Sequence, residues 1–114
     1  MAVTINKREQ GDVTIFDVSG KITLGDGNNE LRSAINNALE AGKKHLLLNL
    51  AELSYLDSSG VGTLVGCFTS AQNRDAKLKL VNLTKKMQDL LAITKLLTVF
   101  DTFDNEEEAI KSWD

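Results

Sequence analysis

A run of small polar residues lies at the centre of the sequence, Asp57-Ser58-Ser59-Gly60-Val61-Gly62. A serine hydroxyl can act as a nucleophile when a base activates it, and it can also accept phosphate from a kinase. A hydrolase nucleophile elbow requires Gly-x-Ser-x-Gly, but Leu56 stands two residues before the first serine and Asp57 two before the second. The run therefore does not predict a hydrolase.

The same run is typical of a helix that begins directly after a strand. Before it, Leu46–Leu50 forms a short apolar stretch that suits a strand buried on both faces. After it, apolar residues recur at helical spacing. Asp57 or Ser58 is then the N-cap, whose short side chain accepts a hydrogen bond from an unpaired backbone N–H. A kinase could reach a serine at such a turn, and an added phosphate would meet helix N–H groups.

Other chemistry lacks the residues it would need. His45 is the only histidine and Cys67 the only cysteine, whereas a zinc site needs several converging ligands. We expect His45 at the surface or a strand edge, and Cys67 as a packed thiol. Glycines stand at Gly60, Gly62 and Gly66, but a dinucleotide loop would have its third glycine at the place of Val65. We therefore predict no metal and no cofactor, and expect the glycines to permit close backbone approach.

Length and composition indicate one domain over residues 1–114. The chain has 42% hydrophobic residues, enough for a single core. Its formal charge is −3, from 13 basic and 16 acidic residues that are interspersed, so nucleic acid is not expected as a partner. No stretch approaches the roughly 20 apolar residues of a membrane helix. We expect a cytoplasmic protein.

Periodicity predicts the elements that hold the central run. We expect strands over Ala2–Lys7, Val13–Ser19, His45–Leu50, Lys77–Val81 and Thr98–Phe100, and helices over Leu31–Leu39, from Asp57 or Ser58 to about Asn73, around Met87–Leu91, and from Asp104 or Asn105 to Trp113. The first two strands form a hairpin, and three successions of strand and helix follow. The fold class is therefore α/β, a single domain with a mixed, mostly parallel sheet and about four helices.

Three finer expectations concern the second half of the chain. Lys77–Val81 alternates charged and apolar side chains, as an outer strand would. Asn82 and Thr84 supply capping oxygens for the third helix. In the last helix, apolar side chains should pack inward, at Ala109, Ile110 and Trp113.

Leu53–Gly62 resembles the STAS domains of bacterial anti-sigma-factor antagonists, whose signature is an apolar residue, Asp-Ser-Ser/Thr-Gly and a second glycine. The other elements also follow in family order. The resemblance implies a switch protein without enzyme activity. In that family a serine kinase that is also the anti-sigma factor phosphorylates the serine after the aspartate, by position Ser58. The unphosphorylated antagonist binds that kinase and frees a sigma factor, and a PP2C-type phosphatase restores the hydroxyl.

We expect the partner surface at the carboxyl ends of the strands, from the Gly20–Asp26 loop and the exposed side of the Ser58–Ser70 helix. Its predicted residues are Lys21, Thr23, Leu24, Asp57, Ser58, Ser59, Gly60 and Gly62. Many family members carry a Gly-Glu-Leu-Asp-like turn, where this chain has Gly20-Lys21-Ile22-Thr23. This difference leaves the identity of the partner open. The protein is expected as a monomer or a weak homodimer.

Two other functions remain open. A STAS module can bind another partner constitutively, such as a transporter-associated ATPase or a large signalling assembly. It can also carry a small ligand or a nucleotide. A phosphate on Ser58 after incubation with kinase and ATP would distinguish the switch from both alternatives.

Overall fold

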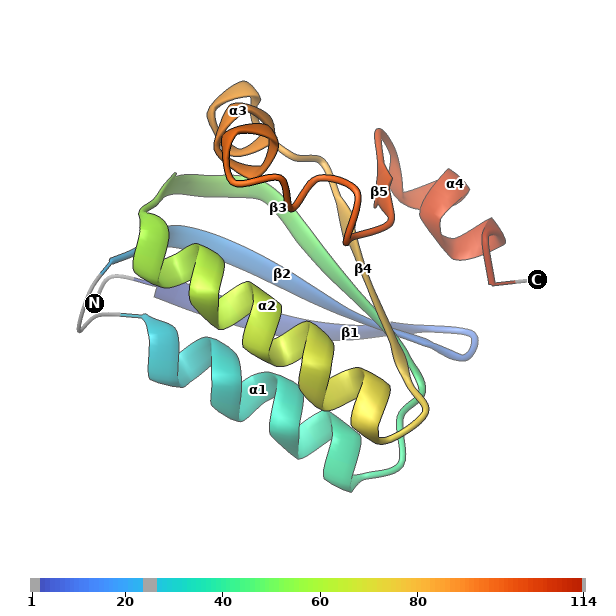
Figure 1. Cartoon of the computed structure of the whole chain (residues 1–114). Helices are drawn as coiled ribbons and strands as arrows, with labels where there is room; N and C mark the ends of the chain where they lie inside the picture. The colour runs from blue at the N-terminus through green and yellow to red at the C-terminus, as the bar shows by residue number, and fades with distance from the viewer. Residues whose placement is uncertain (1–2, 24–26, 114) are drawn as a thin grey trace.

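A computed structural model of the chain describes residues 3–23 and 27–113. Within these residues, five strands form one sheet in the order β1-β2-β3-β4-β5, accompanied by four helices (Figure 1). The elements are β1 (Val3–Gln10), β2 (Val13–Ile22), α1 (Asn28–Glu40), β3 (His45–Leu56), α2 (Ser58–Asn73), β4 (Lys77–Val81), α3 (Lys85–Ile93), β5 (Thr102–Phe103) and α4 (Glu106–Lys111). β1 and β2 pair antiparallel, and the other pairs are parallel. The predicted fold class is confirmed.

The sheet is covered on both faces. Residues of α1, α2 and α3 join the main hydrophobic core on one face, and α4 packs against a smaller cluster on the other. Figure 1 shows α1 and α2 side by side along the sheet, with α4 apart from them. Successive leucines of β3 serve both layers, because Leu46 and Leu48 enter the main core and Leu47 the smaller cluster. This explains the unbroken apolar run in the sequence.

Three strands are longer than predicted, and β1 ends at Gln10 instead of Lys7. β2 continues to Ile22 instead of ending at Ser19, and β3 continues to Leu56 instead of Leu50. The register between them shifts twice, between Asp17 and Ser19 and again after Gly20, yet the ladder resumes. The added residues include the buried Ile22, Leu53 and Leu56 as well as exposed polar ones. Their burial does not alternate strictly, so a period of two does not reveal these extensions.

The strand predicted over Thr98–Phe100 is wrong, because those residues form a turn and β5 follows at Thr102–Phe103. The apolar signal came from Phe100, which is buried in the main core and meets Phe68 edge to face, with ring centroids 5.3 Å apart. Of the two predicted caps, Thr84 accepts from the backbone N–H of Met87. Asn82 instead has a left-handed φ of 62°.

β4 is not the outer strand that its alternating charges predicted, because it pairs with both β3 and β5, and its middle residue is the buried Lys79. Only 6% of Lys79 is exposed because α4 and the residues after it cover that face. Its Nζ donates to Ser112 Oγ at 2.7 Å and lies 4.4 Å from the centroid of a Trp113 ring. This burial lowers the pKa of Lys79. The predicted inward packing of the last helix is confirmed.

Arg8 ties the hairpin to α4. Its guanidinium donates to both carboxylate oxygens of Asp17, at 2.6 and 2.8 Å, and to both of Glu106, at 3.1 and 3.0 Å. Asn49 on β3 adds a bond to Asp17 Oδ1 at 2.8 Å. Hydrogen bonds from Arg8 are the main reason that the pKa of Asp17 is lowered. The cluster therefore joins β1, β2, β3 and α4.

We expect Asp17→Asn to destabilise the fold by about 1 kcal/mol at neutral pH, a modest value because the Arg8 side chain is 42% exposed and solvent screens the pair. The folded-state pKa of Asp17 lies below its unfolded value of about 3.9. Its contribution is therefore complete above that pH and is lost as the pH falls further. The melting-temperature difference between variant and natural protein should shrink as the pH falls below about 4.

The matched control is Asp12→Asn, at the exposed hairpin turn, which should leave the melting temperature nearly unchanged at every pH. A deficit of Asp17→Asn that stays constant down to the lowest pH would contradict the assigned ion pair.

Candidate functional site

The candidate site lies where β2 and β3 end and α2 begins. Ile22 pairs with Leu56 in the last step of the parallel ladder. One residue further, the backbone N–H of Asp57 donates to the Ile22 carbonyl at 3.3 Å. The structure therefore places Thr23, which follows Ile22, next to the start of α2, whereas Lys21 pairs with Tyr55, two residues before Asp57. Leu24, also predicted for the partner surface, lies outside the described residues.

Asp57 is the N-cap of α2, which decides between the two candidates from the sequence. Its backbone is extended, with φ −99° and ψ −173°, and its Oδ1 accepts from the N–H groups of Ser59 at 3.0 Å and Gly60 at 3.2 Å. Ser58 is consequently the first helical residue, and its side chain is exposed. Its hydroxyl is not required to cap the helix. A phosphate at this position would lie at the positive end of the helix dipole.

Ser59 differs from its neighbour because its hydroxyl is held inside the turn. It donates to Asp57 Oδ1 at 2.5 Å and accepts from Asn28 Nδ2 at 3.3 Å. Asn28 Nδ2 also donates to the Thr23 carbonyl at 2.9 Å. One amide therefore links the end of β2, the first residue of α1 and the start of α2. Two adjacent serines thus have opposite environments.

Asn28, Arg32 and Thr63 were missed by sequence reasoning. Thr63 is 1% exposed, and its hydroxyl donates to Asn28 Oδ1 at 2.6 Å. Arg32 Nη2 donates to Thr63 Oγ1 at 3.4 Å. A signal was present, since Thr63 stands four residues after Ser59 and interrupts the apolar stripe of the helix. With Ser59, these side chains line a depression of about 280 Å³ between the starts of the two helices.

The two predicted glycines have different surroundings. A Cβ on Gly60 would lie 2.2 Å from Leu56 Cδ1 and 3.1 Å from Ile22 Cγ2, so Gly60 allows α2 to approach the strand ends. A Cβ on Gly62 would meet nothing within 4 Å. Gly62 is exposed, as are Ser58 and Gly66, which stand four residues to either side of it. These three residues, called here the α2 stripe, lie on one exposed side of the helix.

The remaining reactive residues lie away from this surface. Cys67 is buried, and burial raises the pKa of its thiol to about 11, which makes it unreactive. His45 stands at the opposite end of β3 from Ser58 and stacks on Trp113, with ring centroids 5.2 Å apart. It cannot serve Ser58 as a base.

Over residues 3–23 and 27–113, no three metal-binding side chains of His, Cys, Asp or Glu gather. No helix described is long and apolar enough to span a membrane.

Residues 4–109 match the STAS domain family. The anti-sigma-B factor antagonist of Listeria monocytogenes is 30% identical over 112 residues, which cover 95% of this chain and 93% of the relative. The chain belongs to the STAS family of anti-sigma factor antagonists. This is a family of regulators and not of enzymes.

Solved structures share the fold of this STAS domain. An anti-sigma factor antagonist from Mycobacterium paratuberculosis superposes with a TM-score of 0.86 at 18% identity, covering 97% of this chain and 93% of that one. The Bacillus cell fate determinant SpoIIAA in its phosphorylated form gives 0.73 at 22% identity, covering 99% and 100%. At these identities the likeness shows the fold alone.

The two glycines provide a matched pair of substitutions. We expect Gly60→Ala to cost about 1–3 kcal/mol of stability, because the new methyl group overlaps Leu56. Gly62→Ala should stabilise the domain by up to about 1 kcal/mol, since alanine is the better helix former and meets no neighbour. Urea denaturation of both variants measures the two values. Equal effects at the two positions would contradict the packing described for Gly60.

Proposed function

We propose that this STAS domain is an anti-sigma factor antagonist switched by phosphorylation of Ser58. Its unphosphorylated form binds an anti-sigma factor that is also a serine kinase, and so releases a sigma factor in the cytoplasm. Phosphorylation by that kinase ends the binding, and a PP2C-type phosphatase restores the hydroxyl. The observation that carries the proposal is the exposed Ser58 beside a cap that Asp57 provides.

The contrast between the two serines supports Ser58 as the acceptor. A kinase must bring a hydroxyl within bonding distance of a phosphoryl group, so an exposed serine is the better substrate. Ser59 would first have to give up its bonds to Asp57 and Asn28. The start of α2 therefore exposes the Ser58 hydroxyl and holds the Ser59 hydroxyl in hydrogen bonds inside the turn.

The proposed partner surface combines the end of β2 with the α2 stripe. Lys21 is exposed and Thr23 partly so. Thr23 follows the strand residue that bonds to Asp57, and Lys21 pairs with Tyr55, two residues before it. The absence of side chains at Gly62 and Gly66 lets a partner approach the helix backbone closely. Gly60 contributes indirectly, since it is buried and positions the helix against the strand ends.

Charge explains how modification would act. A phosphate adds about −1.5 to −2 charges at neutral pH. The fold should tolerate it, because the site is exposed and the helix dipole there favours negative charge, although Asp57 is a neighbouring acid. Against a partner, the hydrated dianion would be buried without a counter-charge, and a penalty of ~3 kcal/mol weakens binding on the order of a hundredfold. SpoIIAA, which shares this fold, has been solved in a phosphorylated form, so a domain of this fold can carry a phosphate.

The test uses the full chain, the anti-sigma factor kinase of the same organism, and three variants. Ser58→Ala should bind the kinase and resist release by ATP, and Ser58→Glu should fold but bind more weakly, by up to about a hundredfold. Ser59→Ala should still accept one phosphate, on Ser58. Calorimetric titration gives the affinities, and mass spectrometry of digested protein locates the phosphate.

Gly62→Lys tests the α2 stripe as a contact surface. The lysine should leave Ser58 and the fold intact but block close approach of the partner to the helix. A phosphate on Ser59, or equal affinities of the Ser58→Glu and Ser58→Ala proteins, would overturn the proposal. Binding that persists after incubation with kinase and ATP, with no phosphate added to the chain, would favour a constitutive STAS module instead.

A further inference from the structure

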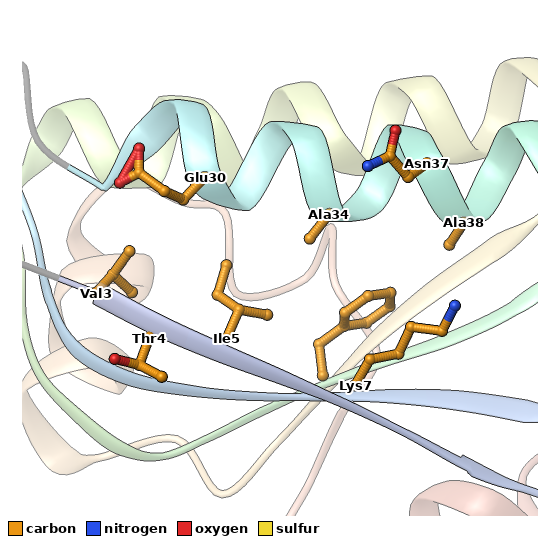
Figure 2. Close-up of a pocket in the computed structure, with 9 residues that line it drawn as sticks. Val3, Thr4, Ile5, Lys7, Glu30, Ala34, Asn37 and Ala38 are labelled. Atoms are coloured by element: carbon orange, nitrogen blue, oxygen red, sulfur yellow. The ribbon is translucent and has the colours of Figure 1, made fainter.

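An open groove of about 540 Å³ runs between β1 and α1, on the edge of the domain. Figure 2 shows it bounded by the strand below and the helix above. Its apolar lining comes from both elements and from β2, at Val3, Ile5, Phe16, Ala34 and Ala38. Lys7 lies toward one end of the groove and Glu30 toward the other (Figure 2). The groove is therefore apolar along its length and oppositely charged at its ends.

The strand side of the groove is an open sheet edge. Among the described strands, β1 pairs only with β2, so its other edge has no strand partner. Native proteins usually protect such edges with charged side chains. Here the charges begin at Lys7, whereas Val3–Asn6 carries none. Thr4 and Asn6 are exposed and Ile5 partly so. The first half of β1 is thus suited to pair with another strand.

The helix side of the groove is lined by small or uncharged residues apart from Glu30. Ala34 is only partly buried, at the middle of the groove, and the exposed Asn37 lines it further along. A small side chain at this position lets a second helix approach closely.

We propose that a second copy of this chain covers the groove in a two-fold symmetric dimer. In it, the first half of β1 pairs antiparallel with the same segment of the other copy, and α1 packs antiparallel on its counterpart. A two-fold axis perpendicular to the sheet reverses the groove, so Lys7 of one copy lies beside Glu30 of the other, twice. With the axis at Ile5, Val3 of one strand faces Lys7 of the other and no like charges oppose each other.

The charges at the two ends of the groove favour a second copy of this chain over an unrelated partner as the molecule that covers it. A groove with a cation at one end and an anion at the other is complementary to itself when reversed. Pairing of the two edges would also extend the sheet across the dimer and cover the exposed part of Ile5. The inference does not depend on the proposed function, because the groove is lined by residues of β1, β2 and α1 and by none of the α2 stripe.

Sedimentation velocity of the full chain over a range of concentrations tests the proposal. We expect a monomer–dimer equilibrium. Lys7→Glu and Glu30→Lys should each weaken association about tenfold, because symmetry makes every substitution act at two contacts. The double variant Lys7→Glu/Glu30→Lys should restore it, since the charges are exchanged and not removed. Both positions are on the rim of the groove, so the variants should fold.

Lys86→Glu, on α3, is the control, because it changes the net charge as much as Lys7→Glu does but lies away from the groove. A chain that stays monomeric up to about 1 mM would overturn the proposal. So would a dimer that Lys86→Glu weakens as much as Lys7→Glu does, or one that the double variant fails to restore.

Discussion

The cap that Asp57 places on α2 is the interaction on which the surface of this domain depends. One carboxylate oxygen accepts from two backbone N–H groups and from the Ser59 hydroxyl. This directs Ser59 inward and leaves Ser58 outside as the first helical residue. A serine at the N-cap position would instead use its own hydroxyl to accept hydrogen bonds from the helix N–H groups. Because the aspartate supplies the cap, Ser58 stays exposed, as the proposed phosphorylation requires.

The cap can hold its position because the chain is tightly packed beneath it. Gly60 allows α2 to rest on Leu56 and Ile22, at the ends of two parallel strands. Asn28 adds hydrogen bonds to both the β2 end and Ser59. With this support, a phosphate added at Ser58 under the proposed switch would change the charge that a partner meets and leave the backbone in place. Such a switch acts through electrostatics at a contact and needs no refolding.

Stability on the opposite face of the sheet has a separate origin. There, α4 is held by Arg8 through Glu106 and by the aromatic and hydroxyl contacts of Lys79. Neither group belongs to the α2 stripe. The sheet therefore separates a face that anchors the end of the chain from a face that carries the proposed signal. The β1 edge, between these faces, offers a third surface.

Sequence alone determined what depends on residues close along the chain. The hairpin, the amphipathic α1, the start of α2 after β3 and the choice of Asp57 or Ser58 as cap all follow from periodicity and capping chemistry within a few residues. The tertiary structure decided what depends on distant elements. It buried Lys79 under a helix that begins 27 positions later, replaced a predicted strand by the packing of Phe100, and joined Asn28 to Ser59 across 31 positions. Local patterns cannot report these outcomes, because burial and polar pairing are set by whichever segments the fold brings together.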